Sequence, residues 1–188
     1  MNLYIADTHF GHANIMRYDH RPFGSVDEMD EFLIKRWQDR VRPDDDVWFL
    51  GDFAMRSHLP MTAYLERLPG KKHLIIGNHD GDLLRDEKAM RMFVSVDQMK
   101  MIRDTLNGQS IEIHLCHYPL LEWNKMFHGS WHVYGHIHNS TGDTYQTLKN
   151  VDKALNAGCM INGYAPASLR ELIQNNEKFK KEHSGQTL

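Results

Sequence analysis

The sequence has few cysteines, no long apolar run and little excess charge of either sign. Only two of its 188 residues are cysteines, and Cys116 and Cys159 lack the CxxC spacing of a redox pair or a thiolate metal site. A thiolate metal site is therefore not implied. The N-terminal segment 1–6 has no basic stretch of the kind that precedes a secretory core, so we predict a reducing, cytoplasmic setting.

No apolar segment approaches the length needed to span a bilayer, which predicts that a membrane is not a partner. The formal net charge is −3 and no basic stripe is present, so nothing predicts nucleic-acid binding. At 41% hydrophobic residues, the chain can build one sizeable core and is too short for two ordinary domains. We predict a single domain over residues 1–182 and a frayed C-terminal tail over 183–188, while the oligomeric state stays open.

Histidine, in contrast, is abundant, with 13 residues scattered along the chain. Many of them fall into five short motifs, which are Asp7-x-His9, Gly51-Asp52, Gly77-Asn78-His79-Asp80, His117 and Gly135-His136-x-His138. Carboxylate, imidazole and amide oxygen are ligands that suit manganese, iron or zinc. Each motif alone is weak evidence, because a Gly-Asp or Gly-Asn pair is more often a turn and a lone histidine is more often a surface or core residue. The ordered set predicts a metal site.

The motifs follow short apolar runs that predict buried strands. We predict strands over 3–6, 47–50, 73–76, 94–103, 109–116, 131–134 and 155–159. Loops at the carboxyl ends of strands in an α/β sheet converge on one crevice. The placement of the motifs therefore supports a shared site independently of their composition.

Helical patterns occupy much of the remaining sequence. Ser25 to Glu28 reads as a capping box that opens a helix. Its expected apolar stripe is Met29, Phe32, Leu33, Trp37 and Val41. Further helices are predicted over 59–68, 83–93 and 167–181, whereas the polar, turn-rich segment 140–153 is predicted to be mobile. Alternating strands and helices indicate the α/β class.

The motifs resemble those of the calcineurin-like metallophosphoesterase family, which run D-x-H, G-D, G-N-H-[DE], H and G-H-x-H in the same order. The resemblance covers about residues 3–138 and is closer to small bacterial and phage members, on the stretches Asp7-Thr-His-Phe-Gly-His12 and Cys116-His-Tyr-Pro119. It implies a two-layered β-sheet sandwich flanked by helices, in a four-layer αββα arrangement.

The resemblance also implies two divalent metal ions, with manganese as the first expectation and iron, zinc or nickel as alternatives. One ion would be held by Asp7, His9, Asp52 and His138. The other would be held by Asp52, Asn78, His117 and His136. A carboxylate shared in this way holds two cations close enough for water between them to ionise near neutral pH, and the resulting bridging hydroxide would attack phosphorus.

Two adjacent residues are implied to act on the substrate. His79 would stabilise a phosphoryl oxygen or protonate the leaving alkoxide, and Asp80 could hold the imidazolium by charge. Met55 stands where the protein-phosphatase branch has a carboxylate that orients this histidine, which disfavours that branch.

Three further residues are candidate substrate contacts. Arg56 aligns with a family arginine that binds phosphate. His12 could face the substrate or hydrogen-bond a metal ligand. Arg17, like the nearby Arg21, could bind phosphate or be a solvated loop charge.

These features predict a dinuclear metal-dependent phosphodiesterase acting on a small, cyclic or other nucleotide-type phosphodiester. A phosphomonoesterase with the same centre is the nearest alternative, because such a centre can hydrolyse either ester. A non-catalytic interaction module is a further alternative, which the full set of ligands disfavours. A single structural metal ion is disfavoured because the candidate ligands outnumber what one closed site takes.

Overall fold

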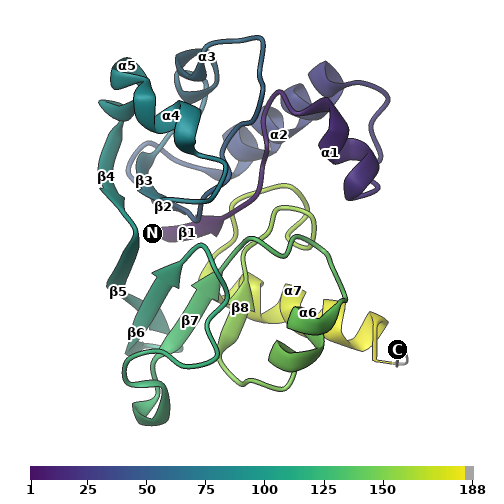
Figure 1. The fold of residues 1–188 in the computed structure, drawn as a ribbon. Helices are drawn as coiled ribbons and strands as arrows, with labels where there is room; N and C mark the ends of the chain where they lie inside the picture. The colour runs from purple at the N-terminus through teal and green to yellow at the C-terminus, as the bar shows by residue number, and fades with distance from the viewer. Residues whose placement is uncertain (185–188) are drawn as a thin grey trace.

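Four N-terminal strands form one parallel sheet in the computed structural model, which describes residues 1–184 (Figure 1). They are β1 (Asn2–Ile5), β2 (Asp46–Phe49), β3 (Lys71–Ile75) and β4 (Phe93–Asp97). Their order across the sheet is β1-β2-β3-β4. Since parallel neighbours point the same way, the loops that follow β1, β2 and β3 leave from one edge of the sheet.

The next four strands form a second sheet. They are β5 (Met99–Leu106), β6 (Gln109–Cys116), β7 (Trp131–Tyr134) and β8 (Ala154–Asn156), in the order β5-β6-β7-β8. The hairpin between β5 and β6 is antiparallel and turns at Asn107-Gly108, as predicted, whereas β6, β7 and β8 are parallel. The chain therefore has a mixed α/β fold with two four-stranded sheets and flanking helices.

The first sheet is buried on both faces, and the side chains of successive strand residues point to opposite faces. Leu3 and Ile5 of β1 lie in a core shared with α2 (Val26–Arg40). Tyr4 packs on the other side, in a second core with residues of both sheets and of α7 (Leu169–Glu182). The near-continuous apolar run of β1 is the sequence signature of this arrangement.

Helix α2 starts where the sequence predicts it. Ser25 Oγ accepts a hydrogen bond from the Glu28 backbone N–H at 3.1 Å, but the Glu28 carboxylate binds the backbone N–H of Gly24 instead of that of Ser25. The capping box is therefore shifted by one residue on its return contact. Phe32 of the predicted stripe is 41% exposed, and Ile34 is buried with the rest of the stripe.

The remaining helices are short. They are α1 (Ala13–Tyr18), α3 (Met61–Leu65), α4 (Gly81–Arg85), α5 (Glu87–Met90), α6 (Asp143–Leu148) and the 3-10 turn η1 (Met126–His128). The single helix predicted over 83–93 is wrong, because the chain breaks at Asp86. The Asp86 carboxylate accepts the backbone N–H groups of Lys88 and Ala89 and so starts α5 as a separate helix.

The single strand predicted over 94–103 is also wrong, since it divides into β4 of the first sheet and β5 of the second. Segment 140–153, predicted to be mobile, contains α6. Of the predicted tail 183–188, residues 185–188 lie outside the described part of the chain. Within residues 1–184, the two cysteines are buried and form no disulfide, and no helix has the length and apolar character required to cross a membrane.

Candidate metal centre

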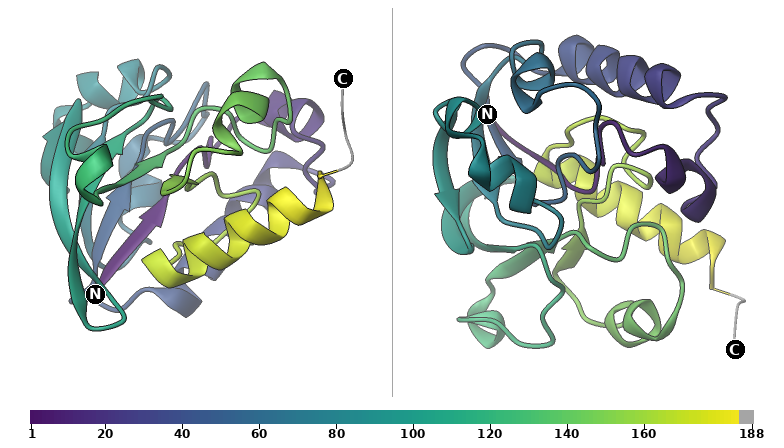
Figure 2. Two further views of the ribbon diagram at one scale, coloured as in Figure 1. Left: turned by 90° about the horizontal axis from the view of Figure 1, so that it is seen from below. Right: turned by 45° about the horizontal axis from the view of Figure 1, so that its top comes forward.

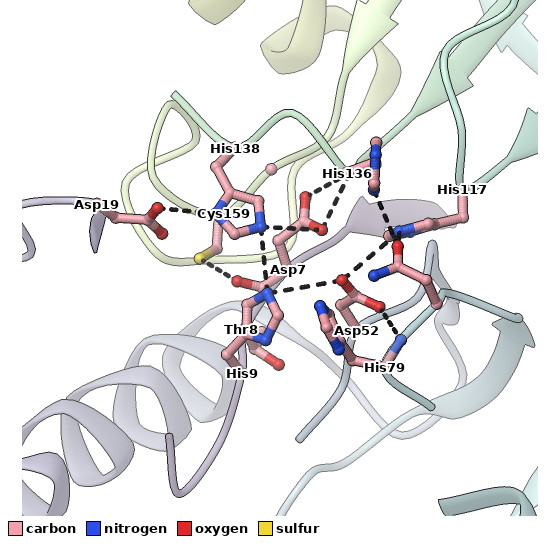
Figure 3. Close-up of polar contacts among 12 residues, drawn as sticks. Asp7, Thr8, His9, Asp19, Asp52, His79, His117, His136, His138 and Cys159 are labelled. Atoms are coloured by element: carbon pink, nitrogen blue, oxygen red, sulfur yellow. Dashed lines mark hydrogen bonds and ion pairs between the residues drawn. The ribbon is translucent and has the colours of Figure 1, made fainter. Parts of the chain in front are cut away.

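The predicted ligands come together at the carboxyl ends of strands from both sheets (Figure 3). The loops after β1, β2 and β3 carry Asp7, His9, Asp52 and Asn78. From the second sheet, His117 directly follows β6, and His136 and His138 follow β7. All seven predicted ligands therefore reach one region, although they span more than half of the chain.

One half of the centre is formed by Asp7, His9, Asp52 and His138, whose candidate ligand atoms all lie within 4.8 Å of one another. The Nε2 atoms of His9 and His138 are 3.2 Å apart, and Asp7 Oδ1 lies 3.8 Å from His138 Nε2. Asp7, His9 and Asp52 are almost completely buried. Two carboxylates and two imidazoles at such distances match the donor set of a divalent transition metal.

The other half is formed around the Asn78 amide. Asn78 Oδ1 lies 2.9 Å from His117 Nε2 and 2.9 Å from His136 Nδ1. Asp52 Oδ2 lies 3.6 Å from His117 Nε2 and 3.7 Å from His9 Nε2, so one carboxylate oxygen faces both halves. This is the position that a bridging carboxylate requires.

Five of these ligands have a left-handed backbone, with φ of 58° at Asp7, 51° at His9, 58° at Asp52, 71° at His136 and 52° at His138. A left-handed conformation at a residue other than glycine costs on the order of 1 kcal/mol or more and persists only where the surroundings enforce it. Strain of this kind gathers at functional sites. Its concentration on the predicted ligands supports a functional centre independently of the motifs.

Glycines of the motifs allow the strand ends to approach each other. A Cβ on Gly77 would lie 2.4 Å from Asp52 Oδ1, and a Cβ on Gly135 would lie 2.6 Å from the Cβ of Ala6. Neither distance is possible for a real side chain. The motif glycines are therefore required by close packing between loops.

Hydrogen bonds to the outer nitrogens show whether the imidazoles fit a metal. His117 Nδ1 lies 2.6 Å from the carbonyl oxygen of Leu50, which can only accept, so this nitrogen carries the proton. In the neutral ring, the lone pair of His117 Nε2 then points at Asn78 Oδ1 and Asp52 Oδ2. Facing lone pairs repel unless a cation lies between them, and the residues therefore fit a bound metal.

The buried carboxylate of Asp7 leads to the same conclusion. Burial raises its pKa to about 6, although the charges of His138 and His117 act in the opposite direction. Both carboxylate oxygens also accept the backbone N–H of His136. A bound cation would compensate for the cost of burying this charge.

The expected pairing of Asp80 with the His79 imidazolium is not found among the hydrogen bonds of residues 1–184. The Asp80 carboxylate is fully buried and accepts the backbone N–H groups of Gly77, Asp52 and Phe53 at 2.7, 3.0 and 2.8 Å. Adjacent residues point in different directions here, because Asp80 turns inward while His79 stays exposed. Asp80 therefore fixes the loops that carry Asp52 and Asn78.

His79 lies at the open side of the centre. Its backbone N–H donates to Asp52 Oδ1 at 2.8 Å, and its ring centroid is 5.7 Å from that of His9. His12 is also close, with its ring centroid 5.7 Å from that of His9. Burial lowers the pKa of His12, and the neighbouring charges of Arg56 and His79 lower it further. The centre is thus bordered by groups that can meet an anionic ligand.

Arg17, in the last turn of α1, and Arg21, in the segment after it, have different surroundings. Arg17 is exposed, with its guanidinium 5.4 Å from the ring centroid of Tyr18. Arg21 is buried and cannot bind a substrate phosphate as considered above. It donates to the carbonyl oxygens of Asp7 and Thr8, both at 2.8 Å, and to the Asp19 carboxylate.

The sequence interpretation missed Asp19. Its Oδ1 accepts the His138 Nδ1–H at 2.8 Å, which leaves His138 Nε2 to face the centre (Figure 3). Its Oδ2 accepts hydrogen bonds from Arg21. The same loop is held by Asn156, whose Nδ2 donates to the His138 carbonyl oxygen at 2.7 Å. Neither residue belongs to a motif, and the only local signal was the proximity of Asp19 to two arginines in sequence.

Comparison with known proteins identifies relatives. No protein-family model matches the chain. The chain is 35% identical over 178 residues to the "Uncharacterized protein MJ1445" of Methanocaldococcus jannaschii. The aligned region covers 94% of this chain and 91% of that protein. The chain belongs to the MJ1445 family. This level of identity over nearly the full length also indicates that the family shares the fold described above.

Two phage proteins extend the similarity of this MJ1445-family chain. The "Gene 66 protein" of Mycobacterium phage L5 is 28% identical over 159 residues, with 72% of this chain and 76% of that protein covered. Its counterpart in Mycobacterium phage D29 is 29% identical over 157 residues. Among solved structures, the protein of unknown function AQ665 from Aquifex aeolicus has a TM-score of 0.68 at 24% identity, over 93% of this chain and 98% of that one. At this level of identity, the similarity to AQ665 shows a shared fold and nothing about function.

Proposed function

We propose that this MJ1445-family chain is a dinuclear metal-dependent phosphohydrolase with the four-layer αββα architecture of calcineurin-like phosphoesterases. The observation that carries the proposal is the position of Asp52. Its Oδ2 lies 3.7 Å from His9 Nε2 and 3.6 Å from His117 Nε2, between two sets of converging ligands. A carboxylate in this place is expected to be shared by two cations.

Asp7, His9, Asp52 and His138 would hold one cation, and Asp52, Asn78, His117 and His136 the other. When bound, two such cations lower the pKa of water toward neutrality and compensate for negative charge on phosphoryl oxygens. The chain itself keeps the lone pairs of His117 and His138 pointed inward through Leu50 and Asp19, and it keeps the loops together through Asp80. Positioning of this kind removes reorganisation from the reaction.

His79 is the group that we propose to protonate the leaving alkoxide. Its ring is exposed at the border of the centre, and its backbone is anchored on Asp52 by the 2.8 Å hydrogen bond. A proton donor beside the reacting phosphorus is needed because an alkoxide is a poor leaving group. Arg56 and His12 are proposed to contact the remaining phosphoryl oxygens.

The proposed substrate is a small phosphodiester of nucleotide type. The support is the resemblance stated above, because paired histidines in Gly135-His136-x-His138 are typical of the phosphodiesterase side of that family. Exposure of Asn78, His79 and His136 leaves the centre open to a small ligand. A phosphomonoester would reach the same groups, and the experiment below separates the two.

The test is hydrolysis of bis(p-nitrophenyl) phosphate and p-nitrophenyl phosphate by metal-stripped protein with added Mn²⁺. We expect metal-dependent cleavage of the diester, loss of cleavage and of metal binding in Asp52→Asn, and loss of cleavage with retained metal binding in His79→Ala. His128→Ala, which removes an exposed histidine outside the centre, is the matched control and should behave as wild type.

Each other result has a defined meaning. Preference for the monoester would favour the phosphomonoesterase. No turnover of either ester by protein that binds two equivalents of Mn²⁺ would favour the non-catalytic module. Loss of metal from His79→Ala would refute the role given to that residue.

A further inference from the structure

A cavity of about 580 Å³ opens directly beside the proposed metal centre. One wall is Tyr18 at the end of α1 with Asp19 and His20 after it, and the other runs from His136 to Thr144 in the first turn of α6. Figures 1 and 2 show α1 and the segment before α6 on the same side of the molecule. His136 and His138 are predicted metal ligands and also line the cavity. A phosphate held at the centre would therefore have its ester group next to this cavity.

The lining has few charges available to a ligand. None of the described lining residues is a lysine or arginine. The Asp19 carboxylate is engaged by His138 and Arg21, which leaves Asp143 as the acidic group that is not paired in this way. The lining itself offers a second phosphate no lysine or arginine, and the Arg17 guanidinium, 5.4 Å from the Tyr18 ring centroid, is outside it, so the cavity favours an uncharged group over a polyphosphate.

The cavity does offer hydroxyl and amide groups and one flat aromatic surface. Asn139, Ser140, Thr141 and Thr144 supply hydrogen-bonding side chains. Tyr18 is 61% exposed. Its ring centroid lies 6.4 Å from that of His12, and the two rings are arranged edge to face. An exposed tyrosine ring next to hydroxyl groups suits a ligand with a flat ring and several hydroxyls.

We propose that this cavity is a specificity site for the alcohol portion of the ester, that this portion is uncharged and contains a ring and hydroxyl groups, as a nucleoside does, and that Tyr18 stacks on the ring. The proposal rests on the proposed function in one respect, because it places the phosphate at the metal centre. It goes beyond that function by assigning the ester group to one side of the centre.

The chain offers a matched control outside the cavity. Tyr118 is 46% exposed, and its ring centroid lies 5.1 Å from that of His117 and 4.8 Å from that of His136, but it does not line the cavity. Both tyrosines therefore border the centre with similar exposure. Only Tyr18 should interact with the ester group.

The experiment is calorimetric titration of Mn²⁺-loaded protein with thymidine 5′-monophosphate and with methyl phosphate. We expect the nucleotide to bind about tenfold tighter than methyl phosphate to the wild type, as stacking on an aromatic ring would give. Tyr18→Ala should abolish this difference, and Tyr18→Phe and Tyr118→Ala should keep it. Methyl phosphate should bind all four proteins equally.

Equal affinity of the wild type for the two ligands would overturn the proposal. So would a tenfold preference that survives in Tyr18→Ala, and so would its loss in Tyr118→Ala. Binding is measured separately from hydrolysis, so a preference that depends on Tyr18 in a protein without turnover supports the cavity and counts against the enzyme. Turnover of bis(p-nitrophenyl) phosphate without that preference would support the enzyme and count against the cavity as the site of the ester group.

Discussion

Single hydrogen bonds decide which nitrogen of His117 and of His138 faces the centre. His138 would be free to turn in its loop if Asp19 did not accept its Nδ1–H at 2.8 Å. Asp19 is in turn fixed by Arg21, which also holds the carbonyl oxygens of Asp7 and Thr8. One ion pair thus connects the first and last ligand loops, and metal affinity should depend on it although neither residue is a ligand.

Replacing Asp19 by Asn should therefore weaken binding of one of the two Mn²⁺ equivalents by about 10- to 100-fold, as loss of the group that orients a ligand histidine typically does. Calorimetric titration of metal-stripped protein measures this change. Asp143→Asn removes an exposed carboxylate from the neighbouring cavity and is the control. Unchanged affinity in Asp19→Asn would show that the Asp19 contact does not position His138.

At the scale of secondary structure elements, β7 contains a buried histidine that is not a ligand. His132 is completely buried, its Nδ1 lies 3.1 Å from the His114 carbonyl oxygen, and its Nε2 accepts the Leu120 backbone N–H at 3.1 Å. Both nitrogens are thus used by the neutral ring. Burial lowers its pKa to about 4, which links the stability of β7 to pH.

Below pH 6.5, His132 takes up a proton in the unfolded chain but not in the folded one, so this contribution to stability is lost as pH falls from about 6.5 to about 4. The loss should reach on the order of 3 kcal/mol. Urea unfolding of wild type and His132→Gln at several pH values tests it. The variant should lose less stability over this window, and equal losses would contradict the prediction.

Some loops between elements depend on a glycine because a Cβ there would clash with a neighbouring loop. Gly77→Ala should cost about 1–3 kcal/mol of unfolding free energy and weaken metal binding, because its Cβ would lie 2.4 Å from Asp52 Oδ1. Gly81→Ala is the control, since the atom nearest to its Cβ would be 3.7 Å away and Gly81 is in α4. Thermal melts and Mn²⁺ titrations of the two variants provide the comparison, which fails if both variants behave alike.

At the scale of the whole molecule, the centre joins the two sheets, since β1, β2 and β3 supply some ligands and β6 and β7 supply the others. Metal should therefore stabilise the fold as one unit. Adding Mn²⁺ at about 100 times its dissociation constant should raise the unfolding free energy by about 2.7 kcal/mol over the stripped protein. Urea unfolding measures this, and Asp52→Asn should show little of the gain. A wild type without any gain would exclude a metal centre at this place.

The sequence predicted β1, β2 and β3 because their apolar runs are buried, and it predicted β6 and β7 with their observed limits. It could not predict that segment 94–103 divides between two sheets, since the residue pattern continues through the point where the chain changes sheet. It also missed α1 and α6, which are only six residues long and have no side-chain cap. Such short helices depend on tertiary packing rather than on local preference.

For the centre, the sequence by itself determined the types and order of the ligands, because donor chemistry is a property of each side chain. Only the tertiary structure decided how they are arranged. It turned Asp80 away from His79 and onto three backbone N–H groups, buried Arg21 against Asp19, and placed Asp52 Oδ2 between His9 and His117. These contacts join residues far apart in the chain or depend on the direction of a side chain, and neither property is contained in a local pattern.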